Sequence, residues 1–181
     1  MNKRIPQELL DAVDYDPATG ILRWRVSFAN GVKAGDQVGY VNPFGYVITN
    51  YKGGGPYLVH RIAYTKVHGT CPPILDHRNG DPTDNSIGNL RPATVSQNGQ
   101  NSKRTKPRLV ALPRGVTIMP PRKYVTKTGE VRFYQRARPY KASVAVSGRK
   151  THLGTFATPD EAATAFRDAA ARHYGEFARP E

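Results

Sequence analysis

The 181-residue sequence contains a single cysteine, Cys71, which excludes an internal disulfide framework and a zinc site built from several thiolates. It also lacks any run near the roughly 20 apolar residues that a bilayer-spanning helix needs. The opening MNKRIPQELLDAVDYD has no apolar run of the signal-peptide type. We therefore expect a soluble, cytoplasmic protein with no membrane partner.

Acidic residues are scarce between Lys103 and Lys150, where 14 basic residues accompany one acid, Glu130. A positive field of this density attracts polyanions, of which nucleic acid is the commonest. The alternative is a basic segment that is only solvated or disordered. Aromatic and apolar residues interleaved with the basic ones argue against disorder alone.

The sequence pattern indicates an α+β protein of short elements, consistent with 17 glycines and 15 prolines. We expect helices over residues 6–13, 59–69, 94–101 and 158–174, and strands from residue 21, within 38–57 and over 71–78. Gly69 and Gly175 are expected to end the second and the last helix, and Thr94 or Ser96 to cap the third. At the start of the last helix, Thr158, Pro159 and Glu161 predict a capping box. Strand-like runs at 114–119, 131–148 and 149–156 precede the last helix. Residues 103–113 have no periodicity and are predicted to be a basic linker between domains at 1–102 and 114–181.

One loop-rich stretch, LDHRNGDPTDNSIGNLRPATVSQNGQN (residues 75–101), places Asp76 beside His77 and is crowded with asparagines. Neighbouring strand residues point to opposite faces, so both side chains serve one site only where the strand ends or bends. The turn signal Asn79-Gly80 supplies that break. Asp76 is then placed to hold a divalent metal while His77 acts as a general base.

Two further asparagines complete this candidate site. Asn98, on the following helix, offers a second oxygen ligand, and Asn89 offers hydrogen bonds to the backbone near His77. One or two hard oxygen ligands suit Mg²⁺ or Mn²⁺, which leave the other positions to water and phosphate, and no zinc is expected. The alternative is structural: an Asp-His pair is often only exposed, and asparagines are common turn formers.

The segment VHRIAYTKVHGTCPPILDHRNGDPTDNSIGNLRPATVSQNGQN (residues 59–101) resembles the HNH homing endonucleases of phages and mobile introns. The preceding YDPATGILRWR and GYVITN are also similar to sequences in that family. The resemblance implies a ββα-metal fold, two strands and a helix around one divalent ion, acting on double-stranded DNA in a bacterial or phage-infected cell. It implies that Asp76 and Asn98 are metal ligands, that His77 is the general base and that Asn89 orients it.

The C-terminal segment from RGV to YKASVAVSGRKTHLGTFATPDEAATAFRDAAARHYGEFA resembles the APETALA-type, or ethylene-response-factor, DNA-binding domain. This resemblance implies a three-stranded antiparallel sheet, backed by one helix, that lies in the major groove. Residues 119–138 form an insertion relative to that family. The resemblance implies DNA contacts from the candidates Arg114, Arg136, Arg138, Tyr140, Lys141, Arg149, Lys150 and His152.

Several other residues have simpler interpretations. Trp24 is expected in a core, and His60 and His68 are expected to be one core or capping histidine and one surface histidine. Tyr140 remains open between packing and DNA contact. The leading prediction is a site-specific metal-dependent endonuclease; the alternatives are a DNA-binding regulator that does not cut and, less favoured, an RNA-binding protein.

Overall fold

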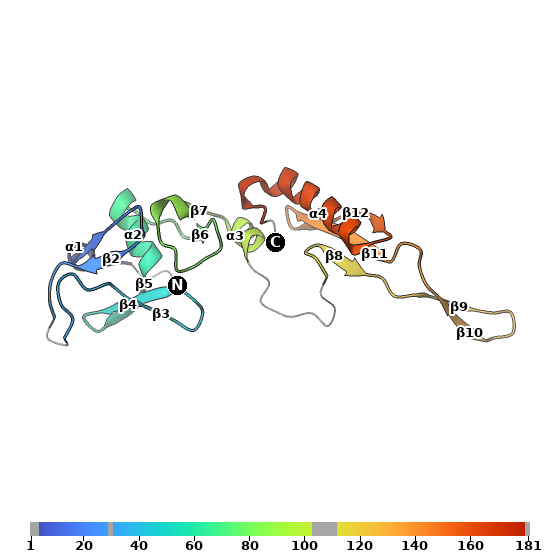
Figure 1. Cartoon of the computed structure of the whole chain (residues 1–181), viewed down its shortest axis with the longest axis horizontal. Coiled ribbons are helices and arrows are strands. Elements are labelled where there is room, and N and C mark those ends of the chain that lie inside the picture. Colours follow the sequence, from blue (N-terminus) through green and yellow to red (C-terminus); the bar gives the residue numbers. More distant parts are fainter. Residues whose placement is uncertain (1–3, 29–30, 103–111, 180–181) are drawn as a thin grey trace. The chain divides into compact units, whose positions relative to one another are not determined.

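The computed structural model describes residues 4–28, 31–102 and 112–179, and these residues form small antiparallel sheets and a few helices (Figure 1). The chain divides into two compact units, Met1–Asn98 and Gly99–Glu181. The division falls inside a helix, whereas the predicted linker at 103–113 lies mostly outside the described residues. In the described part of the chain, no helix is long and apolar enough to cross a membrane.

The first unit begins with alternating short elements. They are α1 (Gln7–Asp11), β1 (Val13–Tyr15), β2 (Leu22–Trp24), β3 (Tyr40–Val41), β4 (Val47–Tyr51), β5 (Gly54–Leu58) and α2 (Val59–His68). Strands β1 and β2 pair as one antiparallel hairpin, and β3, β4 and β5 form a meander in sequence order. The predicted helix at 59–69 is confirmed, and Gly69 ends it in the left-handed conformation with φ 73°.

The core of the first unit joins α1, α2 and the early strands. Leu9, Leu22 and Ile62 are almost completely buried in it. Trp24 packs in the same core, edge-on to Phe28 at 4.9 Å between ring centroids. The expected core role of Trp24 is confirmed. The predicted strand from residue 21 is β2, which begins one residue later and buries Leu22 and Trp24 on one face.

The second half of the first unit supplies the stretch rich in asparagine. Strands β6 (Leu75–His77) and β7 (Leu90–Pro92) form an antiparallel hairpin, with the short 3-10 helix η1 (Ile87–Asn89) before β7. Helix α3 (Val95–Asn101) follows within a few residues. The predicted strand at 71–78 and helix at 94–101 are present, whereas β7 was not predicted from the residue pattern.

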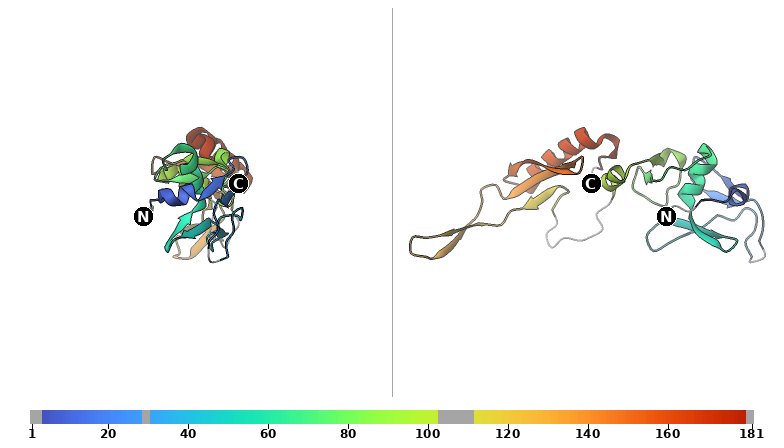
Figure 2. Two further views of the ribbon diagram at one scale, coloured as in Figure 1. Left: turned by 90° about the vertical axis from the view of Figure 1, so that its left-hand side faces the viewer. Right: turned by 180° about the vertical axis from the view of Figure 1, so that it is seen from behind.

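The second unit contains the predicted three-stranded antiparallel sheet and its helix. Strand β11 (Tyr140–Val146) lies between β8 (Val116–Ile118) and β12 (Arg149–Phe156). Helix α4 (Pro159–Tyr174) packs along one face of this sheet, as Figures 1 and 2 show, and is followed by the 3-10 helix η2 (Gly175–Phe177). The core lies between them, where Val144 packs on Phe166, Ala169 and Ala170.

The start of α4 has the predicted cap at Thr158, whereas Glu161 does not complete the predicted capping box. Thr158 Oγ1 accepts a hydrogen bond from the Glu161 backbone N–H at 3.2 Å, and Pro159 occupies the first turn. Glu161 Oε2 accepts from the Ala157 N–H, one residue before the position that a standard capping box uses. Both contacts supply partners to backbone donors that the helix leaves unpaired.

The long run predicted as one strand over residues 131–148 is divided in the structure. It contributes β10 (Val131–Tyr134) and β11, and β10 pairs with β9 (Arg122–Val125) in a separate two-stranded sheet. The interruption QRARP contains Pro139, which has no backbone N–H to donate to a sheet. The 119–138 insertion is thus mostly a β-hairpin, called here the β9–β10 ribbon (Arg122–Tyr134).

Candidate active site at the β6–β7 hairpin

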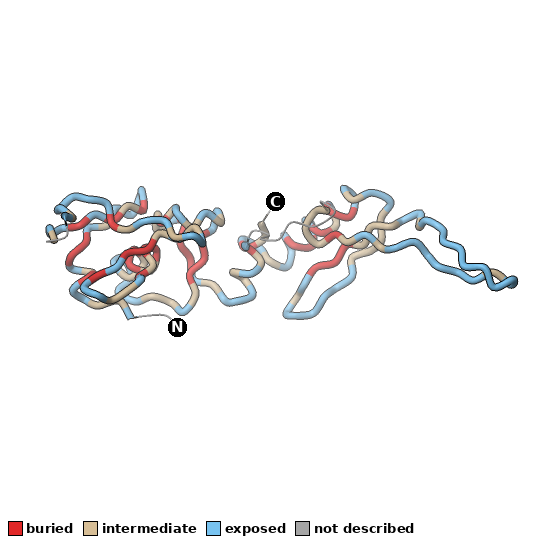
Figure 3. Tube along the Cα trace, turned by 90° about the horizontal axis from the view of Figure 1, so that it is seen from below, coloured by how far each residue is buried: buried red, intermediate tan, exposed pale blue. Residues whose placement is uncertain are grey.

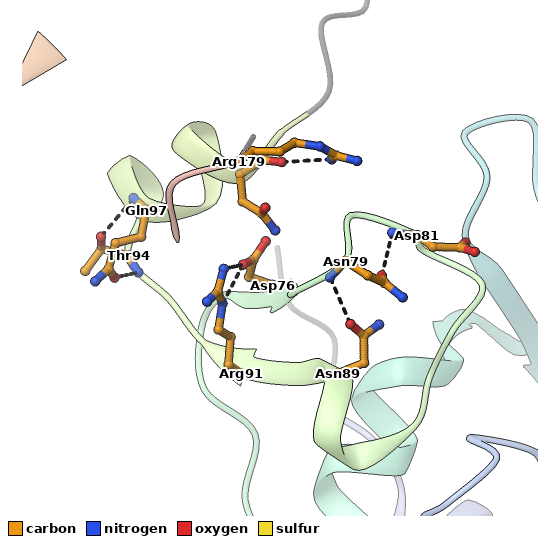
Figure 4. A network of polar contacts seen from close by, with 9 residues as sticks. Asp76, Asn79, Asp81, Asn89, Arg91, Thr94, Gln97 and Arg179 are labelled. Atoms are coloured by element: carbon orange, nitrogen blue, oxygen red, sulfur yellow. Dashed lines mark hydrogen bonds and ion pairs between the residues drawn. The ribbon is translucent and has the colours of Figure 1, made fainter. Parts of the chain in front are cut away.

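Asp76 is paired with an arginine across the hairpin. Asp76 and Arg91 are cross-strand neighbours, and Arg91 Nε and Nη2 each lie 2.8 Å from Asp76 Oδ2 (Figure 4). Both side chains are about 95% buried. A buried carboxylate requires a partner charge, which Arg91 supplies. The guanidinium also fixes the direction in which the carboxylate points.

His77, the next residue, is held by an asparagine that the sequence analysis did not single out. His77 Nε2 lies 3.3 Å from Asn85 Oδ1. The Asn85 amide nitrogen donates to Thr83 O at 3.2 Å, so its oxygen is the atom that faces the imidazole. Because this oxygen can only accept, the neutral imidazole carries its proton on Nε2. The Nδ1 atom then holds the lone pair, as a base requires.

An aromatic and imidazole cluster surrounds His77. The ring of His60 from α2 meets the His77 ring edge-on, with 5.0 Å between centroids, and Tyr46 lies against both. His60 is 5% exposed, and its Nδ1 has no hydrogen-bond partner among the residues that the structure describes. His60 is therefore the core histidine that the sequence left open as one of two possibilities.

Burial sets the protonation of both histidines. It lowers the pKa of His60 to about 3, and the neighbouring charges of His77 and Arg61 act in the same direction. Burial also lowers the pKa of His77, although the Asn85 hydrogen bond and nearby aspartates favour its charged form. His77 is consequently neutral at physiological pH and available to accept a proton.

Asn89 stabilises the loop between the two strands. Its Oδ1 accepts from the Asn79 backbone N–H at 3.0 Å, and its Nδ2 donates to Asp84 O at 2.8 Å. Asn79 in turn accepts from the Asp81 N–H at 2.8 Å and donates to Asp84 Oδ2 (Figure 4). Asn89 thus makes the expected backbone contact two residues after His77, and Asn79 serves as a turn former.

A turn from the start of the chain, residues 15–21, packs against the same loop. Tyr15 Oη donates to Asn85 O at 2.8 Å, and the Ile87 N–H donates to Pro17 O at 3.0 Å. Gly20 has φ 75°, and a Cβ at this position would overlap the backbone of Asn85 and Ser86. The 15–21 turn therefore fixes the backbone position of Asn85. Because Asn85 contacts His77, the turn also supports the orientation of His77.

Asn98 lies in α3 and is half-buried, with its backbone N–H bonded to Thr94 O at 3.0 Å. The start of α3 has a reciprocal cap: Thr94 Oγ1 accepts from the Gln97 N–H, and Gln97 Oε1 accepts from the Thr94 N–H (Figure 4). This confirms Thr94 as the capping residue. The pairing of Asn98 with Asp76 around a cation stays a prediction.

The donor chemistry fits a hard divalent ion. Asp76 and Asn98 offer carboxylate and amide oxygens, which Mg²⁺ and Mn²⁺ prefer. Among the described residues, no group of three or more His, Cys, Asp or Glu side chains is arranged to hold a metal. A site built on these two oxygens would leave most positions to water and a phosphate oxygen.

The DNA-contact candidates of the second unit occupy different environments. Strand pairing places Lys141, Lys150 and His152 on the sheet face opposite α4. Arg149 pairs with Val146, on the α4 side, and Tyr140 packs partly buried in the core with Phe156, which favours its packing interpretation. The other candidates lie in connections.

The three remaining candidates, Arg114, Arg136 and Arg138, lie outside the strands of the sheet. Arg114 precedes β8 and donates to Gly99 O and Ser102 O. Arg136 and Arg138 lie between β10 and β11, where Arg136 Nε donates to Pro120 O at 2.9 Å. Arg136 and Arg138 are therefore not on the β8–β11–β12 sheet, because the division of the 131–148 run leaves them outside its strands.

Four residues of this site had no predicted role: Tyr15, Tyr46, Asn85 and Arg91. His60 was expected only as a core, capping or surface histidine, without a contact to His77. The role of Arg91 could have been predicted from the sequence, because antiparallel pairing of residues 75–77 with 90–92 places this basic residue opposite Asp76. The contacts of Tyr15 and His60 with the loop depend on tertiary packing, which no local pattern indicates.

Comparison with known protein families finds a match that includes the β6–β7 hairpin. A family model described as HNH endonuclease matches residues 57–100, the segment that contains β6, η1, β7 and most of α3. This match supports the HNH part of the predicted resemblance. It stops at residue 100, at the very start of the second unit, so the APETALA-type resemblance stays a prediction. No curated protein and no solved structure matches the chain.

Proposed function

We propose that this protein is a metal-dependent DNA endonuclease of the HNH class whose second unit binds DNA. The observation that carries the proposal is the environment of His77. It is a neutral, oriented imidazole beside a buried carboxylate, within the range that matches HNH endonucleases. In more detail, we infer the site-specific, homing-type activity that phage and intron enzymes have.

In the proposed mechanism, His77 Nδ1 takes a proton from a water molecule as its oxygen attacks the scissile phosphorus in line. Asn85 keeps the opposite ring nitrogen protonated and so maintains the tautomer. Asn89 keeps the loop that follows His77 closed. Asp76 and Asn98 would hold a Mg²⁺ or Mn²⁺ ion, which would supply positive charge for the phosphate and the leaving 3′ oxygen.

The second unit is proposed to supply most of the affinity. Lys141, Lys150 and His152 share a solvent-facing side of its sheet, as a groove-binding APETALA-type surface requires. Phosphate contacts from basic residues make binding sequence-tolerant and strongly dependent on salt.

The test is cleavage of supercoiled plasmid by the purified full chain with Mg²⁺ or Mn²⁺. We expect His77→Ala to lower the rate by at least the roughly 100-fold that general-base catalysis contributes, with DNA affinity unchanged. His68→Ala, at an exposed position at the end of α2, is the matched control. Equal cleavage by His77→Ala and the control would refute the assigned base.

A DNA-binding regulator that does not cut is the second candidate. One observation favours it: Arg91 already neutralises the Asp76 carboxylate without any metal. Tight binding of duplex DNA, with no nicking by the wild-type protein under either ion, would support this alternative.

A further inference from the structure

The β9–β10 ribbon packs on no buried apolar cluster among the described residues of its unit. All eight residues of its two strands are exposed, and Figure 3 shows both strands in the exposed colour. Phe133 is 66% exposed and Val125 61%. An isolated two-stranded hairpin is marginal in water, so these large side chains contribute little to folding where they are.

The ribbon is nevertheless well defined at both ends. At its tip, the Thr126 N–H donates to Glu130 O, and Thr126 Oγ1 accepts from the Glu130 N–H. At its base, the Met119 N–H donates to Pro139 O, and Arg136 Nε donates to Pro120 O. The chain therefore holds the ribbon as a preformed arm on the second unit.

Strand pairing gives the ribbon two different faces. One face carries the cross-strand pairs Arg122 with Tyr134 and Tyr124 with Arg132; the other carries Lys123 with Phe133 and Val125 with Val131. Arg122 Nη1 donates to Tyr134 Oη at 3.0 Å, and Arg132 is oriented by donating from Nε and Nη2 to Glu130 Oε2. Each face thus combines basic side chains with aromatic or aliphatic ones.

Charge decides which partner fits this arm. Residues 122–136 contain five basic residues and one acid, a net charge of +4. A second copy of the chain would bring the same positive charge against it, which opposes self-association through the ribbon. A duplex presents phosphates along both sides of a major groove that is wide enough for a two-stranded ribbon.

We propose that the β9–β10 ribbon is a DNA-binding arm that enters the major groove. Its basic residues contact phosphates, and Phe133 and the tyrosines contact base edges. The arm extends the stretch of DNA read beyond what the β8–β11–β12 sheet contacts. This inference rests on the proposed function only in taking duplex DNA as the substrate.

The experiment measures binding without cleavage. The full chain is titrated into a labelled mixed-sequence duplex at several NaCl concentrations with EDTA present, and affinity is read by fluorescence anisotropy. Lys123→Gln/Lys127→Gln removes two charges from the ribbon, and Arg167→Gln/Arg172→Gln removes two from the exposed side of α4 as the matched control. Circular dichroism and thermal melting check that each variant is folded.

We expect the ribbon variant to lower the slope of log affinity against log salt by up to about 1.8, since each phosphate contact contributes about 0.9, while the control leaves the slope near that of the wild type. Phe133→Ala should weaken binding without changing the slope. Hydroxyl-radical footprinting should show protection lost at one end of the bound site in the ribbon variant.

Equal slopes and footprints for the two double variants would overturn the proposal. So would a wild-type dimer that Phe133→Ala converts to monomer with DNA affinity unchanged, because the ribbon would then bind a second copy. Neither result bears on the proposed nuclease, which is tested separately by plasmid cleavage with His77→Ala.

Discussion

Asp76 and Arg91 face each other across the β6–β7 hairpin and form a buried ion pair through a single carboxylate oxygen, Asp76 Oδ2. The proposed metal ligand is therefore part of the structural interior of the hairpin. Arg91 compensates the negative charge of Asp76, so the fold does not need a bound cation to keep this carboxylate buried.

Removing the Arg91 side chain should therefore destabilise the first unit. Arg91→Met leaves a buried carboxylate without its charge partner and should lower the free energy of unfolding by about 3–5 kcal/mol. Urea titration followed by the fluorescence of Trp24, the only tryptophan, reports on the first unit.

The matched control is Arg25→Met, which breaks the exposed Arg25–Asp14 pair, 3.5 Å apart, and should cost less than about 1 kcal/mol. A similar loss for both variants would show that Asp76 does not depend on Arg91. Adding Mg²⁺ should recover part of the loss in Arg91→Met if Asp76 binds a cation.

His60 should make the stability of the first unit depend on pH. Its pKa is about 3 in the folded state and about 6.5 when unfolded, so between these values the unfolded chain binds more protons. Stability is then full above pH 6.5 and falls as the pH drops toward 3. The loss at pH 5 relative to neutral pH should be about 2 kcal/mol from His60 alone.

Urea titrations at pH 7 and pH 5 measure this difference. His60→Gln should reduce it, whereas the exposed His68→Gln should leave it unchanged. An identical pH dependence in wild type and His60→Gln would contradict the assignment of His60 as a buried neutral group.

Asn85 should control the activity of His77 without affecting DNA binding. Asn85→Ala removes the acceptor that keeps the proton on His77 Nε2, so the imidazole loses its fixed tautomer and orientation. We expect the plasmid cleavage rate to fall by about tenfold or more, a smaller loss than the roughly 100-fold expected when the base itself is removed. Asn50→Ala, an exposed asparagine on β4, is the control, and an unchanged rate in Asn85→Ala would remove Asn85 from the site.

Gly20 should be intolerant of a side chain. Gly20→Ala forces a Cβ against the backbone of Asn85 and Ser86, and we expect about 1–3 kcal/mol of destabilisation beyond that of a matched glycine. Gly35→Ala is the match, because Gly35 has φ 92° and nothing within 4 Å of the added Cβ. Equal losses in urea titration would mean that backbone conformation alone explains the effect.

The sequence predicted those parts of the fold that local chemistry determines. Helix α4 was located by Thr158, Pro159 and Gly175, and α2 by its apolar spacing and Gly69. The division of the 131–148 run was missed because aromatic and β-branched residues continue on both sides of QRARP. In the site, Asp76 and His77 were found from their pattern, whereas His60, Asn85 and Tyr15 lie far apart in sequence and meet only through packing.

The contacts of the 15–21 turn have a practical consequence for how much chain an active fragment must retain. The HNH match begins at residue 57, but Gly20, Tyr15 and Pro17 support the loop that orients His77, and Leu9, Leu22 and Trp24 fill the core beneath α2. A fragment trimmed to the matched range would keep every proposed catalytic side chain and lose the scaffold that aligns them. Autonomous folding should therefore require a start upstream of α1.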